Sequence, residues 1–122
     1  MKTLETRKAI KEELSKHCEH IYYGQADDNA AFPYAVFSIE EISKNDLVPM
    51  YELEINVVGY GKDTSYVENI CDNIESGMDH MTVNADHIAF TLYFDRKNNV
   101  TAEDRNIIRR LMTFSFNLYE RG

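Results

Sequence analysis

Residues 51–60 of the chain read YELEINVVGY, and this run decides the class of fold. Apolar side chains occupy every second position from Tyr51 to Val57, and two glutamates and an asparagine occupy the positions between them. Such alternation indicates a β-strand whose two faces meet different surroundings. One face is apolar and the other is acidic, which predicts an antiparallel strand with one solvent-exposed side. We expect Gly59 and Gly61 to end this strand.

Two helices are predicted, one near the N-terminus and one directly after the central strand. Residues 64–81 place apolar side chains at steps of three and four, which is the spacing of an amphipathic helix. Ser65 and Glu68 have the spacing of a capping box in its first turn. Residues 3–18 are rich in good helix formers. The apolar stripe of this first helix is thin and consists of Leu4, Ile10, Leu14 and Cys18.

Further strands are expected on both sides of the central one. Residues 34–42 and 87–95 alternate with a period of two, and residues 20–24 could form a short strand. Residues 96–99 are expected to form a polar turn. The segment from 107 to 112 could continue a helix, but the alternation from 112 to 119 predicts that the chain ends in a strand.

These elements predict one α+β domain over residues 1–122, in the order α-(β)-β-β-α-β-β. The simplest architecture is an antiparallel or mixed sheet of four or five strands, with both helices packed on one face. The other face, which carries Glu52 and Glu54, would meet solvent or another subunit. Polar loops are expected at 25–32 and 43–49.

Charge and composition exclude several classes of function. The net charge of −8 argues against a nucleic-acid partner, which requires a basic surface. No run approaches the roughly 20 apolar residues of a membrane span, and the charged first residues argue against a secretory signal. We therefore expect no membrane association and synthesis in the cytoplasm, with Cys18 and Cys71 as free thiols.

No motif predicts a catalytic, cofactor-binding or metal site, and we expect a protein that is not an enzyme. His17, Cys18 and His20 cluster, but they lack the paired spacing of a zinc site. The run from Gly59 to Thr64 joins a strand to a helix, as a phosphate-binding loop does, yet it lacks the glycine spacing of the known motifs. These glycines are better explained as a turn.

The residues instead favour surfaces that meet other proteins. Eight tyrosines lie mostly on or beside the predicted strands, and tyrosine is enriched at protein interfaces. Ordinary strand composition explains them equally well. The predicted interface combines the basic side of the first helix, the acidic strand face and the two polar loops. Its residues are Arg7, Lys11, Asp27, Asp28, Lys44, Asp46, Glu52, Glu54 and Tyr60.

The sequence also resembles a known family. Residues 21–26 (IYYGQA) and 32–37 (FPYAVF), the strand at 51–60, the helix at 66–74 and the strand at 110–119 are similar to those of phage and prophage tail completion or tail terminator proteins.

This resemblance implies a non-catalytic virion protein that forms a ring, often hexameric. The ring would cap the tail tube and join it to the head. Its partners would be copies of itself, the tail tube protein and head-completion or connector proteins. It would assemble in the host cytoplasm and remain in the virion tail. The alternative is a small ligand-binding or regulatory α+β domain.

Overall fold

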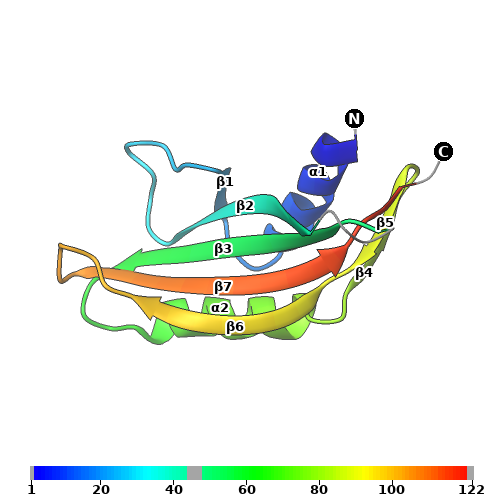
Figure 1. Cartoon of the computed structure of the whole chain (residues 1–122). Helices are drawn as coiled ribbons and strands as arrows, with labels where there is room; N and C mark the ends of the chain where they lie inside the picture. Colours follow the sequence, from blue (N-terminus) through cyan, green and yellow to red (C-terminus); the bar gives the residue numbers. More distant parts are fainter. Residues whose placement is uncertain (1, 44–47, 121–122) are drawn as a thin grey trace.

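The computed structural model describes residues 2–43 and 48–120. In chain order the elements are α1 Lys2–Leu14, β1 His20–Tyr23, β2 Tyr34–Ser43, β3 Met50–Tyr60, α2 Ser65–Met78, β4 Thr82–Asn84, β5 Ile88–Thr91, β6 Tyr93–Val100, β7 Ile107–Asn117 and β8 Tyr119–Glu120. Within these residues the main sheet has five strands in the order β1-β2-β3-β7-β6, and a smaller sheet pairs β4, β5 and β8 (Figure 1). The chain is an α+β protein, as predicted.

The central position of β3 fixes the two faces of the main sheet. It pairs antiparallel with β2 on one side and with β7 on the other, and β1 joins the far edge of β2 in parallel. Leu53 lies between Ile39 and Phe114 in this register. Because side chains alternate along a strand, one face of the sheet collects the apolar residues. The sheet is therefore mixed, one of the two expected arrangements.

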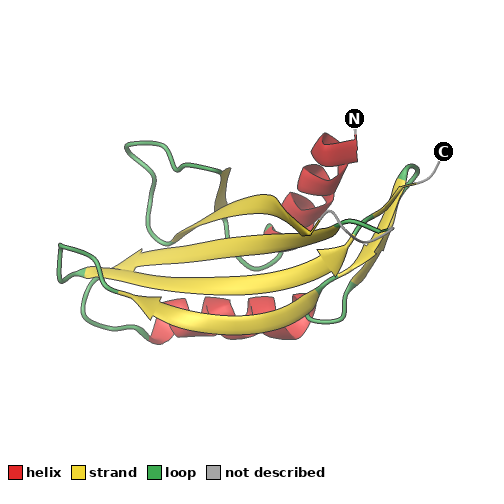
Figure 2. Ribbon diagram, viewed as in Figure 1, coloured by secondary structure: helices red, strands yellow, loops and turns green. Residues whose placement is uncertain are grey.

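Both helices cover this apolar face, and the opposite face stays open (Figure 2). Helix α2 packs on β3, β6 and β7 through Val67, Cys71, Ile74 and Met78, all essentially buried. Helix α1 and the residues after it contribute positions four apart. These are Thr6, Ile10, Leu14 and Cys18. Leu4, expected in this stripe, is instead 51% exposed, because the buried stripe follows steps of four back to Thr6.

The start of α2 differs from the predicted capping box. Thr64 occupies the N-cap position, and its side chain makes no capping hydrogen bond. The carboxylate of Asp63 instead accepts hydrogen bonds from the backbone N–H and the hydroxyl of Ser65. These hydrogen bonds lower the pKa of Asp63. The turn before the helix is therefore held by the residue that precedes the cap.

Gly59 does not end β3, which continues to Tyr60. At this point the strand approaches α2 so closely that a Cβ on residue 59 would lie 2.5 Å from the Tyr66 hydroxyl and from Cγ2 of Val67. The Tyr66 hydroxyl accepts a hydrogen bond from the Tyr60 N–H at 2.6 Å and donates one to the Tyr60 carbonyl at 2.7 Å. The glycine therefore permits the contact that joins the end of β3 to α2.

The predicted strand at 87–95 is in fact two strands in different sheets. The backbone of Leu92 hydrogen-bonds to His80 and Met81, which separates β5 from β6. The segment 96–99 was expected to be a turn, and this prediction was wrong because β6 extends through it. Edge strands often carry charged side chains, and Lys97 on this one lies 3.4 Å from Glu68 of α2.

A polar group ties α2 to the sheet beside this edge. Arg110 of β7 donates a hydrogen bond from Nε to Glu68. Burial raises the pKa of Glu68, but the hydrogen bond and charge of Arg110, together with Lys97, outweigh it and lower the pKa overall. Glu68 therefore stays ionised and pairs with two cations, which holds the first turn of α2 on β6 and β7.

Gly59→Ala is expected to lower the free energy of unfolding by about 1–3 kcal/mol, because the added methyl group overpacks a filled contact. Urea unfolding followed by circular dichroism measures this. Asn73→Ala, on the exposed side of α2, is the matched control and should change little. A loss for Gly59→Ala no larger than that of the control would contradict the close-approach explanation.

Candidate functional site

One face of the main sheet is covered by neither described helix (Figure 2). On β3 it carries the even-numbered residues, beginning with Glu52, because the odd-numbered ones face the core. We define the open face by its residues on the four long strands. They are Tyr34, Val36, Ser38 and Glu40 of β2; Glu52, Glu54, Asn56, Val58 and Tyr60 of β3; Arg109, Leu111, Thr113 and Ser115 of β7; and Tyr93, Arg96 and Asn98 of β6.

One half of this face gathers carboxylates. Glu40 and Glu52 lie directly opposite each other on β2 and β3, and Glu54 follows on the same face. Asp95 of β6 accepts a hydrogen bond from Ser115 at 3.3 Å. Burial and the charges of Glu54 and Asp95 raise the pKa of Glu52, and Arg96 only partly offsets them. We call Glu40, Glu52, Glu54 and Asp95 the acidic half.

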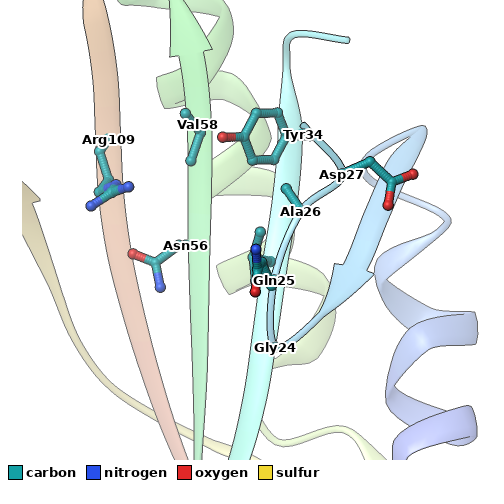
Figure 3. Close-up of a pocket in the computed structure, with 9 residues that line it drawn as sticks. Gly24, Gln25, Ala26, Asp27, Tyr34, Asn56, Val58 and Arg109 are labelled. Atoms are coloured by element: carbon teal, nitrogen blue, oxygen red, sulfur yellow. The ribbon is translucent and has the colours of Figure 1, made fainter. Parts of the chain in front are cut away.

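The other half contains a cavity of about 370 Å³. The segment from Gly24 to Asp27 forms one wall, and the strands form the rest. The lining residues are Gly24, Gln25, Ala26, Asp27, Tyr34, Val36, Asn56, Val58 and Arg109. Figure 3 shows Arg109 and Asn56 reaching into the same space, with Gln25 and Tyr34 across it. We call this space the Arg109 cavity.

Arg109 brings a positive charge to this cavity. Its guanidinium makes no ion pair with any carboxylate among residues 2–43 and 48–120. Its Nε is buried and has no hydrogen-bond partner within the same ranges. A buried donor without a partner costs free energy, so an acceptor supplied from outside the chain would be stabilised here.

A cluster of aromatic rings lies beside the Arg109 cavity and includes its lining residue Tyr34. Phe32 lies with its ring centroid 5.5 Å from that of Tyr34 and 5.5 Å from that of Tyr60. Tyr22 contacts Tyr34 edge-on at 6.0 Å. Phe32 and Tyr60 are 44% and 49% exposed. Aromatic and arginine side chains dominate binding energy at protein interfaces, so this combination is typical of an interaction surface.

The structure places the predicted interface residues in three regions. Glu52, Glu54 and Tyr60 lie on the open face. Asp27 and Asp28 are exposed in the loop between β1 and β2; Asp27 lines the cavity, although its carboxylate points away from Arg109 in Figure 3.

The remaining predictions lie elsewhere. Lys11 is exposed on α1. Arg7 is half-buried, with its guanidinium carbon 3.8 Å from the centre of the Tyr23 ring. Lys44 and Asp46 lie outside the described residues. The structure thus brings Asp27 to the cavity of the face that carries Glu52, Glu54 and Tyr60, and it puts the helix predictions away from that face. Their role in an interface stays a prediction.

Sequence reasoning missed Arg109, Phe32 and the cavity itself. A signal for Arg109 existed, since it shares strand alternation with Leu111, Thr113 and Ser115 and so belongs to their face. The cavity had no such signal, because its walls come from residues 24–27 and from β7, more than eighty positions apart.

The cysteines and the glycine turn that the sequence offered as candidates for chemistry have structural roles. Burial raises the pKa of the Cys18 thiol, and it raises that of Cys71 to about 11, so neither thiol is activated. Gly61 donates its backbone N–H to the carbonyl of Asn106, which commits this part of the glycine turn to the fold. No group of three or more potential metal ligands occurs in the described part of the chain. Neither described helix is both long and apolar enough to span a bilayer.

Similarity to known proteins is found in the fold of the chain and not in its sequence. No protein-family model matches the sequence, and no curated protein matches it in sequence. Among solved structures, a chain from the virion of a native gene transfer agent particle is similar with a TM-score of 0.69. The similarity covers 88% of this chain and 84% of that one, at 12% sequence identity. The two chains therefore share a fold.

Glu52→Gln is expected to stabilise the folded chain at pH 7. A raised pKa means that ionised Glu52 is less favourable in the folded than in the unfolded state, so its cost appears as pH rises through the folded pKa. Removing the charge should raise the free energy of unfolding by roughly 0.2–1 kcal/mol, the scale of a cross-strand pair.

Urea unfolding at several pH values measures this effect. The gain should disappear below the ordinary glutamate pKa of 4.5 and should shrink in high salt because the charges are screened. Glu103→Gln, at an exposed loop position, should give no comparable gain. Equal effects of the two variants at pH 7 would mean that the acidic half carries no repulsion.

Proposed function

We propose that this chain is a structural protein of a phage-like particle, and that its open face is the surface through which it assembles. The observation that carries the proposal is the uncovered face of a five-stranded sheet, with repelling carboxylates in one half and an unpaired arginine in the other. Charges that lower the free energy of unfolding of the isolated chain are best explained by a partner that binds this face and compensates them. The fold shared with a chain of a gene transfer agent virion supports a role in such a particle.

Within the particle, we assign the chain to the end of the tail. The resemblance of its sequence to tail completion and tail terminator proteins supports this assignment. The chain would form a ring, such as a hexamer, cap the tail tube and contact head-completion or connector proteins. A ring joins two different patches of neighbouring subunits, and the two halves of the open face differ in charge as that requires. The role is one of assembly without catalysis.

Immunogold electron microscopy of purified particles tests this role. An epitope-tagged chain, expressed in the strain that makes the particle, should label the joint between head and tail. Label along the tail or on the head would contradict the tail-end assignment, and unlabelled particles would contradict a virion role altogether.

Glu52→Lys combined with Glu54→Lys should leave the chain folded and exclude it from particles, because the change reverses the charge of the acidic half. Circular dichroism checks the fold, and immunoblotting of purified particles measures incorporation. Glu19→Lys combined with Glu103→Lys makes the same change of net charge at exposed loop positions and should be incorporated normally. Equal incorporation of both double variants would show that the acidic half is merely solvated.

The cavity supports one alternative, a small ligand-binding or regulatory domain. Its volume of about 370 Å³ lies at the lower end of the range for ligand pockets. Thermal-shift screening with metals, nucleotides and common metabolites separates the two functions, because a ligand that binds only the folded state raises its melting temperature. Reproducible stabilisation that Arg109→Gln abolishes would favour the alternative.

A further inference from the structure

The two halves of the open face complement each other in charge. The acidic half lies toward the start of β3 and the Arg109 cavity lies toward its end. Val58, opposite Arg109, is six residues beyond Glu52, which is about 20 Å along a strand. This distance keeps the guanidinium from pairing with Glu52 within one chain. Glu52 and Arg109 of one chain therefore stay apart, whereas Glu52 of one copy can reach Arg109 of another.

We propose that the Arg109 cavity is a carboxylate-binding site for a second copy of this chain, and that the group it receives is Glu52 of that copy's acidic half, with Glu40 beside it. The inference deepens the proposed function by naming the partner of the open face, and it rests on that face being the assembly surface.

The geometry allows this contact without any change of fold. If two copies meet face to face with their β3 strands antiparallel, the acidic half of each lies over the cavity of the other. Glu52 of one copy then lies over β3 of the other copy, and Arg109 of that copy is on the neighbouring strand β7. With the β3 strands parallel instead, and one copy shifted by half the face, one acidic half meets one cavity while the other acidic half and cavity stay free. This is the contact between unlike patches that a ring requires.

The open face is large enough for a stable contact. The four long strands lie about 4.8 Å apart and are 8 to 11 residues long. The open face therefore measures roughly 19 by 33 Å, or about 630 Å² for each copy. This area lies at the lower end of the roughly 600–1,000 Å² per partner that specific protein interfaces bury. The face also offers aromatic side chains, including Tyr34 and Tyr60, that can pack around the ion pair.

The chemistry of the cavity suits an acceptor that carries a negative charge, and a carboxylate of a second copy is such a group. Within the described ranges the buried Nε of Arg109 has no hydrogen-bond partner, and the amide of Asn56 lines the same cavity. Such a pair suits a negatively charged acceptor, for example a carboxylate. The same chain presents four carboxylates together on one surface. A second copy therefore supplies the required group in the required setting.

Charge exchange tests the inference. Sedimentation velocity at low salt, over concentrations up to the solubility limit, should show that the wild-type chain self-associates. Arg109→Glu should weaken this association by at least about 30-fold, the scale for removing one partner of a desolvated charge pair. Arg109→Glu combined with Glu52→Arg should restore most of it, because the pair is rebuilt with the charges exchanged.

Two further variants complete the test. Arg105→Glu makes the same change of net charge at an exposed position between β6 and β7 and should associate as the wild type does. Arg109→Gln removes the charge conservatively and replaces Arg109→Glu if circular dichroism shows that the latter is unfolded.

Three outcomes would overturn the inference: a wild-type chain that stays monomeric, equal association of the position-109 and position-105 variants, or a folded double variant that fails to recover. A monomeric chain that is still found in particles would leave the proposed function standing, so the two failures are distinguishable.

Discussion

The pairing of β3 between β2 and β7 is the constraint on which the rest of the structure depends. A shift of this register by one residue would move Leu53, Ile55 and Val57 to the open face and Glu52 and Glu54 into the core. Burying two carboxylates without partners is far more costly than any gain from new contacts. The alternation of β3 therefore fixes which face receives the helices and which face remains open.

The same register explains why the open face has two unlike halves. Glu40 and Glu52 become neighbours because β2 and β3 pair antiparallel at that point. Arg109 and Asn56 reach one space from adjacent strands, and the segment after β1 closes it. The chain thus keeps the carboxylates and the unpaired guanidinium on one surface but apart. This arrangement costs stability in a single copy, and in the proposed assembly it would orient the contacts between copies.

Strong local patterns made the fold predictable. The alternation of β3 and the three-and-four spacing of α2 identified the central strand and the main helix, and their order identified the class. Weak or polar patterns gave two wrong predictions, one in α1 and one in β6. Leu4 looked like part of the α1 stripe, because nothing local marks Thr6 as the buried alternative. The polar run at 96–99 looked like a turn, because an edge strand paired on one side needs few apolar residues.

The candidate site was only half predictable. Glu52, Glu54 and Tyr60 follow from the alternation of one strand, but the Arg109 cavity depends on tertiary packing between distant segments. The close approach of β3 to α2 at Gly59 could not be predicted either. A glycine before a turn is typical of the end of a strand, and only the fold brings Tyr66 against it.

The central claim is that protein covers the open face in the assembled particle. Thiol labelling of a Ser38→Cys variant tests it most directly, because Ser38 lies on that face and both native cysteines are buried. The account predicts that the new thiol reacts in the free chain and is protected in purified particles. A Ser15→Cys variant, at an exposed position beyond the end of α1, reports labelling away from the face. Equal reaction of the Ser38→Cys thiol in the free chain and in particles would contradict the account.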